Sequence, residues 1–278
     1  MGLRIATNTT SINALRQMSV TRGSLDGSLE RLASGSRINR SGDDAAGLAI
    51  SENLRANIRG VRQAKRNAQD GISMIQVSEG GLNGISNILI RLRELAIQSA
   101  SDTIGDNERS FTDREFQSLK QEVDRIANVT EFNNTPLLNG KAGIFEIQVG
   151  VRNNPILDRI VYDGAKADAT LESLKLGGES VATKQGAQLT LSVVDDALSR
   201  VNSIRSDLGA LQNRLQSTID NQAILDENLS AANSRIRDTD IAEEVSEMTK
   251  QNILMQAGVA VLGHANNTMN TALKLLNE

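Results

Sequence analysis

Residues 194–236 read VDDALSRVNSIRSDLGALQNRLQSTIDNQAILDENLSAANSRI, and this stretch carries the clearest structural signal in the chain. Its apolar side chains repeat every seventh residue along two tracks, and eleven of the thirteen positions on these tracks are apolar. The tracks are Val194, Val201, Leu208, Leu215, Gln222, Leu229, Ile236 and Ala197, Ile204, Leu211, Thr218, Leu225, Ala232. Such a repeat is typical of a helix whose narrow apolar seam is covered by a second helix. We therefore predict a coiled-coil helix of roughly 65 Å, at about 1.5 Å per residue.

A second seven-residue repeat lies upstream and can cover this seam. It runs through Leu54, Val61, Ala68, Ile75, Leu82, Leu89 and Ala96. Glycines within this stretch lower its intrinsic helicity by about 1 kcal/mol each, so packing rather than propensity must hold the helix. We expect a mainly α fold in which the two long helices form an antiparallel coiled-coil rod.

The two ends of the chain repeat this design on a smaller scale. Residues 5–33 carry apolar side chains at helical spacing, and the last 38 residues, 241–278, carry another seven-residue repeat. Polar joints separate both segments from the long helices. We expect the terminal helices to pair with each other, which divides the chain into a core domain of residues 1–43 and 237–278 and a rod domain of residues 44–236.

The middle of the chain changes character. Residues 107–129 predict a third helix with Phe111 and Phe116 on one side. Turn residues follow around Pro136, and residues 145–149 then alternate apolar and polar side chains as a half-buried strand does. A turn at Pro155 could bring residues 157–162 back beside that strand. We expect a small β-hairpin region at about 131–186, at the tip of the rod.

Composition excludes several classes of protein. The chain has 278 residues, no Cys and no Trp, and only 2% aromatic residues, which gives little support for base stacking on nucleic acid. The absence of Cys excludes a disulfide or thiolate metal site. The first residues show no apolar run after a charged start, so neither a cleavable signal peptide nor a membrane span is expected.

The candidate catalytic residues have simpler explanations. His264 is the sole histidine, and no second His or Cys is present to complete a site. The carboxylate pairs Asp43–Asp44, Asp195–Asp196 and Glu243–Glu244 lie near expected helix starts, where the helix dipole stabilises negative charge. We therefore expect no enzyme activity, no metal and no cofactor.

The apolar stripes of the terminal helices have no globular body to cover them. They would leave apolar surface exposed in the monomer, which indicates self-association into either a closed ring or an open filament. The predicted contact residues are Ile5, Ile12, Leu15, Leu25, Leu29, Leu32, Met248, Met255, Leu262, Met269 and Leu276.

Several motifs closely resemble the bacterial flagellins. They are LERLASGSRIN at 29–39, GDDAAG at 42–47, NAQDGIS at 67–73, RLRELAIQ at 91–98, RSDLGALQNR at 205–214, SRIRDTD at 234–240 and QAG at 256–258. Together they cover roughly residues 1–150 and 186–278. Compared with larger members, the chain has only about 35 to 50 residues where those insert outer domains, so it resembles a short flagellin.

This resemblance implies a structural subunit that polymerises into the helical filament of the bacterial flagellum for motility. It implies export through the flagellar type III apparatus, an extracellular location, and contacts with an export chaperone and with hook-associated and cap proteins. It also implies that Arg91, Leu95, Gln98 and Glu115 contact the host Toll-like receptor for flagellin. Arg91, Leu95 and Gln98 lie on a helix face away from the predicted seam, although Leu95 could instead pack on the third helix or on a neighbouring subunit.

Two other functions are compatible with paired long helices. A hook–filament junction protein shares the terminal design, but the motifs at both ends favour a flagellin. A cytoplasmic chemoreceptor-like signalling hairpin would have a helical turn at its tip, which the Pro- and Asn-containing segment at 131–162 does not predict.

Overall fold

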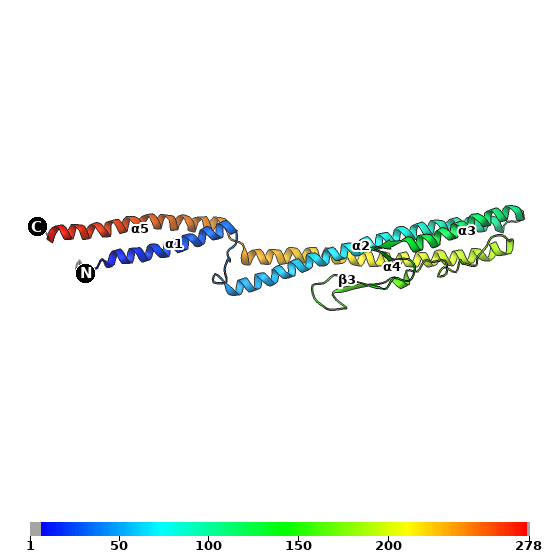
Figure 1. The fold of residues 1–278 in the computed structure, drawn as a ribbon, viewed down its shortest axis with the longest axis horizontal. Coiled ribbons are helices and arrows are strands. Elements are labelled where there is room, and N and C mark those ends of the chain that lie inside the picture. Colours follow the sequence, from blue (N-terminus) through cyan, green and yellow to red (C-terminus); the bar gives the residue numbers. More distant parts are fainter. Residues whose placement is uncertain (1–6, 277–278) are drawn as a thin grey trace. The chain divides into compact units, whose positions relative to one another are not determined.

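The computed structural model describes residues 7–276, with side chains as far as residue 268. The fold is mainly α, as predicted: the helices are α1 (Thr9–Ser34), α2 (Ala45–Ala100), α3 (Asp106–Val129), α4 (Lys184–Arg237) and α5 (Ile241–Leu276). The chain forms two compact units, which we call unit 1 (Met1–Ala56 and Asn228–Glu278) and unit 2 (Asn57–Glu227). Figure 1 shows the helix pair of α1 and α5 and the longer helices of unit 2.

In unit 2, α2 and α4 run antiparallel. Three ion pairs join them, from Arg62 to Asp226, from Glu79 to Arg205 and from Arg93 to Asp195, so residue numbers fall along α4 as they rise along α2. The pairing of the long helices is therefore confirmed. The first seam track is buried from Val194 through Gln222, and its partners Val61 to Ala96 on α2 are buried as well.

The second seam track ends earlier than predicted. Ala197, Ile204 and Leu211 are buried, but Leu225 is 45% exposed. At this level α4 borders a groove rather than continuous apolar packing, and Leu225 is among the groove's lining residues. The prediction that Leu225 is a seam residue was therefore wrong.

Helix α3 turns back along α2. Arg91 on α2 bonds Glu115 on α3, and Gly81 on α2 lies against Thr130 just beyond the end of α3. Phe116, Val123 and Ala127 are fully buried in this contact, whereas Phe111 is 64% exposed. The prediction that Phe111 shares the packed side of the helix was wrong, and its ring instead lies beside the Arg114 guanidinium.

Two buried cations, one near the start of α3 and one in its middle, hold the helix in place. The Arg109 guanidinium donates to the carbonyls of Ser99 and Ser101, at the end of α2. The Lys120 ammonium donates to the carbonyls of Gly177 and Glu179. Burial lowers the pKa of Lys120. Both cations thus satisfy carbonyl oxygens of loop or helix-end backbone.

The strands in residues 7–276 form two small antiparallel hairpins. Strands β1 (Glu131–Phe132) and β2 (Thr135–Pro136) form the first, and β3 (Ile144–Gln148) and β4 (Arg159–Asp163) form the second, with Phe145 opposite Tyr162. A 3-10 turn, η1 (Gly164–Lys166), follows.

The second hairpin does not lie at the tip of the helix pair, where the sequence analysis placed it. It lies beside the middle of unit 2, because Asn67 on α2 donates to the carbonyl of Gln148 and Gly71 packs against Ile147. The reason is the direction of α3, which carries the chain back along α2 before the hairpins begin. The small β-hairpins themselves are confirmed.

Candidate self-association surfaces

Unit 1 is built on the antiparallel pair of α1 and α5. The Asn8 amide donates to the carbonyl of Ala265, Met18 packs on Gly258, and Arg31 bonds Glu244. The predicted pairing of the N- and C-terminal helices is therefore confirmed.

Local sequence fixes where these two helices begin and end. The Asn8 side chain caps α1 by accepting from the Ser11 amide, and Gly35 ends α1 with a φ of 67°. Glycine adopts this left-handed conformation without a steric penalty. Asp240 caps α5 by accepting from the amides of Ala242 and Glu243.

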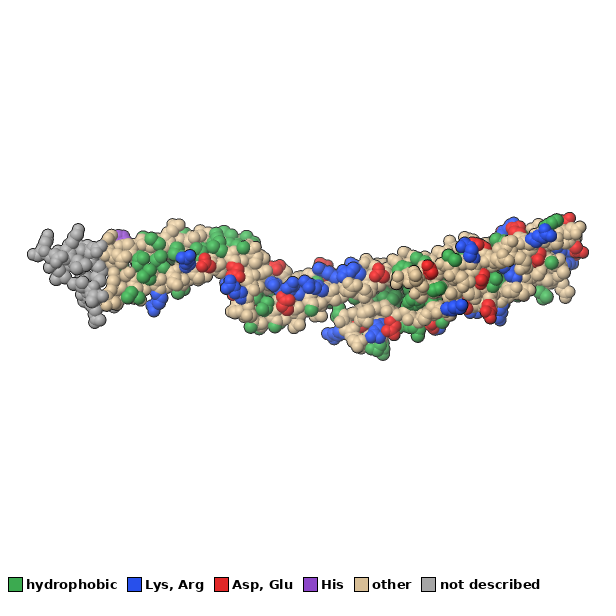
Figure 2. All heavy atoms as spheres, in the orientation of Figure 1, with side chains coloured by type: hydrophobic (Ala, Val, Ile, Leu, Met, Phe, Trp, Pro, Cys, Tyr) green, Lys and Arg blue, Asp and Glu red, His purple; other side chains and the backbone are tan. Residues whose placement is uncertain are grey.

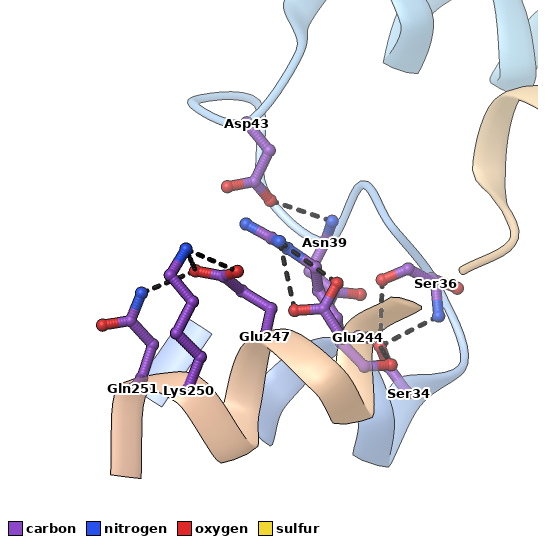
Figure 3. A network of polar contacts seen from close by, with 9 residues as sticks. Ser34, Ser36, Asn39, Asp43, Glu244, Glu247, Lys250 and Gln251 are labelled. Carbon is purple, nitrogen blue, oxygen red and sulfur yellow. Dashed lines mark hydrogen bonds and ion pairs between the residues drawn. The ribbon is translucent and has the colours of Figure 1, made fainter. Parts of the chain in front are cut away.

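The joint between α1 and α2 is held by backbone-to-carboxylate hydrogen bonds. The Asp43 carboxylate accepts from the amides of Asn39 and Arg40, and these bonds lower its pKa. Figure 3 shows Asp43 and Asn39 near Glu244 and Glu247, which project from α5. The adjacent Asp44 accepts from the Gly47 amide at the start of α2. These carboxylates organise the backbone of the joint, as the helix-start interpretation predicted for this pair.

The Asp195–Asp196 pair is different. Asp195 lies well inside α4, which begins at Lys184, and it bonds Arg93 across the coiled coil. The expectation that this pair marks a helix start was wrong.

The large apolar residues of the seam between α1 and α5 are only half-buried, whereas the small polar Thr21 and Ser28 are buried. On both helices the seam residues alternate between spacings of three and four, but several are small or polar, such as Thr21, Ser28 and Gly258. Five of the predicted self-association residues lie half-buried on these facing stripes: Leu25, Leu32, Met248, Met255 and Leu262. The seven-residue repeat of α5 is therefore covered in part by α1 of the same chain.

Other apolar residues of the pair point outward. Of the predicted contact residues, Ile12, Leu15 and Leu29 are 56%, 52% and 47% exposed. Further exposed apolar residues on α5 were missed, and they include four in its middle that lie off the repeat that faces α1: Ile253, Leu254, Val259 and Val261, between 48% and 60% exposed. Figure 2 shows apolar side chains gathered along this helix pair. We call these seven residues the outward apolar set.

Three predicted contact residues cannot be placed on either surface. Ile5 lies outside the described residues, and the side chains of Met269 and Leu276 lie outside the described part of α5. Their role stays a prediction.

The predicted receptor surface in unit 2 is partly exposed. The Arg91 guanidinium donates to the carboxylates of Glu115 and Glu94, which raise its pKa, and its side chain remains 49% exposed. Gln98 is exposed too. Leu95, however, is 2% exposed and belongs to the core of unit 2. Its assignment to an outward face was wrong, because α2 packs against α3 on that side as well as against α4.

Among residues 7–268, no group of three or more His, Asp or Glu side chains is placed to hold a metal ion. No helix in the described part of the chain is long and apolar enough to cross a membrane. The sole histidine, His264, is exposed on α5.

The comparisons with known proteins agree with this architecture. Residues 5–142 match the bacterial flagellin N-terminal helical region, and residues 191–276 match the bacterial flagellin C-terminal helical region. The chain is 44% identical to a flagellin of Halalkalibacterium halodurans over 97% of its length and 98% of the relative. It is 40% identical to the flagellar filament 30.7 kDa core protein of Treponema maltophilum, over 97% and 98% of the two chains.

A solved structure supports the same relationship. The crystal structure of Bacillus cereus flagellin is similar with a TM-score of 0.50 and 29% identity, over 56% of this chain and 88% of that one. Two matched regions that cover most of the chain, together with relatives of the same length, establish the relationship. The chain belongs to the bacterial flagellin family, a family of structural filament proteins rather than enzymes.

Proposed function

We propose that this chain is the subunit that polymerises, outside the cell, into the helical filament of the bacterial flagellum and so serves motility. The observation that carries the proposal is the outward apolar set on α1 and α5. A soluble monomer rarely exposes so many large apolar side chains on so small a helix pair, unless another molecule covers them.

Burial between subunits would supply the driving force. Full burial of one Val, Leu or Ile side chain contributes roughly 1.5–3 kcal/mol relative to exposure. The seven residues are already about half covered, so each would contribute about half of this amount, and together they supply a free energy comparable to the entropy lost on association.

The proposal assigns different roles to the two parts of the chain. Residues 1–43 and 237–278 form the core of the filament, and residues 44–236 form the domain outside it. Association that repeats without closing produces a filament rather than a ring. Contacts with the export apparatus, its chaperone, and the hook-associated and cap proteins remain predictions from the family resemblance.

Seeded polymerisation tests this function. Val261→Asp introduces a charge into the outward apolar set, where burial of an unpaired carboxylate costs several kcal/mol. We expect the variant to keep the circular dichroism of the monomer and to lose the increase in light scattering after seeding. Asn266→Asp on the same helix is the control, since Asn266 is exposed but not part of the set. Normal filament growth by Val261→Asp would show that the outward apolar set does not mediate polymerisation.

We also propose that Arg91, Gln98 and Glu115 form a surface that the host Toll-like receptor for flagellin binds. An Arg at the centre of an interface is often a hot spot worth about 2 kcal/mol or more. Arg91→Ala should weaken receptor binding at least about tenfold. Arg93→Ala is the matched control, because Arg93 bonds Asp195 on α4 instead. Equal receptor affinities of the Arg91→Ala and Arg93→Ala variants would show that Arg91 is not part of the receptor-binding surface. Leu95 would act only by supporting the surface from the core.

A further inference from the structure

Two Asn-Gly steps occur in the sequence, Asn83–Gly84 and Asn139–Gly140. Such a step is chemically reactive, because glycine has no side chain to hinder its amide nitrogen when this nitrogen approaches the side-chain amide of the preceding asparagine. The reaction also needs a backbone that leaves the nitrogen free and lets the two groups meet. The structure places the two steps in opposite backbone environments.

The first step lies inside a helix. Asn83 and Gly84 are in the middle of α2, where the Gly84 amide donates to the carbonyl four residues earlier, as in any α-helix. A nitrogen bound in this way does not readily lose its proton, and the regular helical backbone cannot turn it toward the Asn83 side chain. The Asn83 side chain is nevertheless exposed to solvent. Exposure alone would therefore select Asn83 as the reactive residue, whereas the backbone excludes it.

The second step lies in the loop that joins β2 to β3. Gly140 has a φ of 69°, and its amide donates to no acceptor among the described residues. The Asn139 side chain folds over this peptide, since its Oδ1 accepts from the Lys141 amide at 3.1 Å. That hydrogen bond polarises the side-chain carbonyl and makes Cγ more electrophilic. In this loop both the attacking nitrogen and the group that it attacks are therefore available.

We propose that Asn139 is a self-modification site, at which the side-chain amide is lost through a cyclic imide formed with Gly140. The Gly140 nitrogen gives its proton to water and forms a bond to Cγ of Asn139. The bond between Cγ and Nδ2 breaks, and ammonia leaves after Nδ2 takes a proton from water. Water then opens the ring at either carbonyl. Cleavage of the new bond leaves aspartate at position 139, and cleavage of the original peptide bond leaves isoaspartate, in which the backbone runs through Cγ.

The isoaspartate product changes a contact beside the loop. Leu138 is fully buried, and its carbonyl accepts from the Ala169 amide at 2.9 Å. Isoaspartate adds one carbon atom to the backbone directly after this residue. Gly140 has little room to absorb the change, because a Cβ built on it would lie 2.7 Å from the Asp168 carboxylate. Both products also add a negative charge one residue from Asp168's contact with Gly140, where like charges repel. The modification should therefore weaken the hold of this loop on Ala169.

This reaction goes beyond the proposed filament function and does not depend on it. Water is its only co-reactant, and every group that takes part belongs to one chain. It can therefore be measured in the purified full chain as a monomer. Subunits of a long-lived polymer would accumulate the change with age.

Peptide mapping of the full chain by mass spectrometry tests the site. After incubation at mildly alkaline pH, we expect replacement of the amide NH₂ by OH at residue 139 at least about tenfold faster than at residue 83, since α2 must open locally before Gly84 can react. The rate should rise with pH, because the attacking nitrogen must lose its proton. In concentrated urea neither step is held by structure, and the two rates should become similar.

Asn139→Gln is the matched variant, because a glutamine would have to form a larger, six-membered ring, which closes far more slowly. Methyl transfer by an isoaspartate methyltransferase measures the isoaspartate product, and we expect the signal of the aged chain to be lost in this variant. Hydrogen exchange of the Ala169 amide measures the structural consequence. This amide should exchange faster in aged than in fresh unsubstituted protein, and equally fast in fresh and aged Asn139→Gln protein.

The outcomes are distinct from those of the polymerisation experiments. Preferential modification of residue 139 in the folded chain, with loss of the isoaspartate signal in Asn139→Gln, supports the site. Equal rates at residues 83 and 139 in the folded chain overturn it. A residue 139 that stays intact in the folded chain but reacts in urea also overturns it. Failure of the chain to form filaments would remove the proposed function and leave this site unaffected.

Discussion

The guanidinium of Arg31 on α1 lies 3.3 Å from the carboxylate of Glu244 on α5, across 213 residues of sequence. Glu244 is 9% exposed and lies in the first turn of α5, where the helix dipole also stabilises its charge. Arg31 is more exposed and lies in the last turn of α1. The pair thus fixes the register of two helices whose seam contains few large apolar contacts.

Arg31→Ala should destabilise the helix pair by about 1–2 kcal/mol, since it leaves a mostly buried carboxylate without its partner. Adding Glu244→Gln to that variant should recover part of the loss. Hydrogen exchange of the α5 amides measures the effect. Lys250→Ala breaks the exposed pair with Glu247 and is the control, for which we expect a change below about 0.5 kcal/mol. Equal protection in all three variants would contradict a role for Arg31 in pairing.

Two adjacent glycines of α2 should respond to alanine in opposite directions. A Cβ at Gly80 meets nothing within 4 Å, so Gly80→Ala should stabilise unit 2 by up to about 1 kcal/mol through helix propensity. A Cβ at Gly81 would lie 2.6 Å from Thr130 Oγ1 and 2.8 Å from Leu138 Cδ1. Gly81→Ala should therefore destabilise by about 1–3 kcal/mol through overpacking. Chemical denaturation measures both, and a stabilising Gly81→Ala would show that α2 and the first hairpin pack loosely.

Two leucines of α4 test where the seam ends. Leu215 is fully buried, and Leu215→Ala should cost about 2–5 kcal/mol in unfolding free energy. Leu225, ten residues later on the second track, is 45% exposed, so Leu225→Ala should cost about 1 kcal/mol or less. Similar losses in thermal or urea unfolding would mean that the coiled coil continues through Leu225.

Tyr162 gives the stability of unit 2 a specific pH dependence. Burial raises the pKa of this sole tyrosine to about 12, whereas its ordinary value is about 10. Between these values the unfolded chain loses the phenolic proton first, so the unfolded state binds fewer protons and stability falls as pH rises. We expect ionisation of Tyr162 to lower the free energy of unfolding by up to about 2 kcal/mol as the pH rises from 10 to 12. Below this range Tyr162 has no such effect.

Tyr162→Phe isolates that contribution, because the lysines titrate alike in both proteins. The Tyr162 hydroxyl is buried without a partner in the described structure, so its removal should not destabilise the protein at neutral pH. The difference in unfolding free energy between the two proteins should grow from pH 10 to 12. Tyrosinate absorbance of the native chain with a midpoint near pH 10 would contradict the buried environment.

The helices and their pairing could be predicted from the sequence because a seven-residue repeat specifies both a helix and a seam. Val194, Val201, Leu208 and Leu215 occupy that seam as expected. What the repeat does not specify is how many partners a helix has. Helix α2 packs against α3 as well as α4, which buries Leu95 outside the predicted stripe.

The candidate surfaces were harder to predict, again because the repeat does not specify all the partners of a helix. The repeat of α5 identifies the side that faces α1 in the same chain, so Met248, Met255 and Leu262 are half-buried there. Residues off the repeat, such as Val259 and Val261, carry the outward surface. Similarly, no local pattern indicates that α3 returns along α2, and this direction decides where the hairpins lie.

Electron microscopy of the purified full chain after seeding shows whether the protein forms an open filament. We expect long tubular filaments of the unsubstituted protein, and only short or no polymers after removal of residues 241–278, which deletes α5 and most of the outward apolar set. Closed rings, discrete oligomers or a persistent monomer from the full chain, or filaments of normal length without residues 241–278, would contradict it.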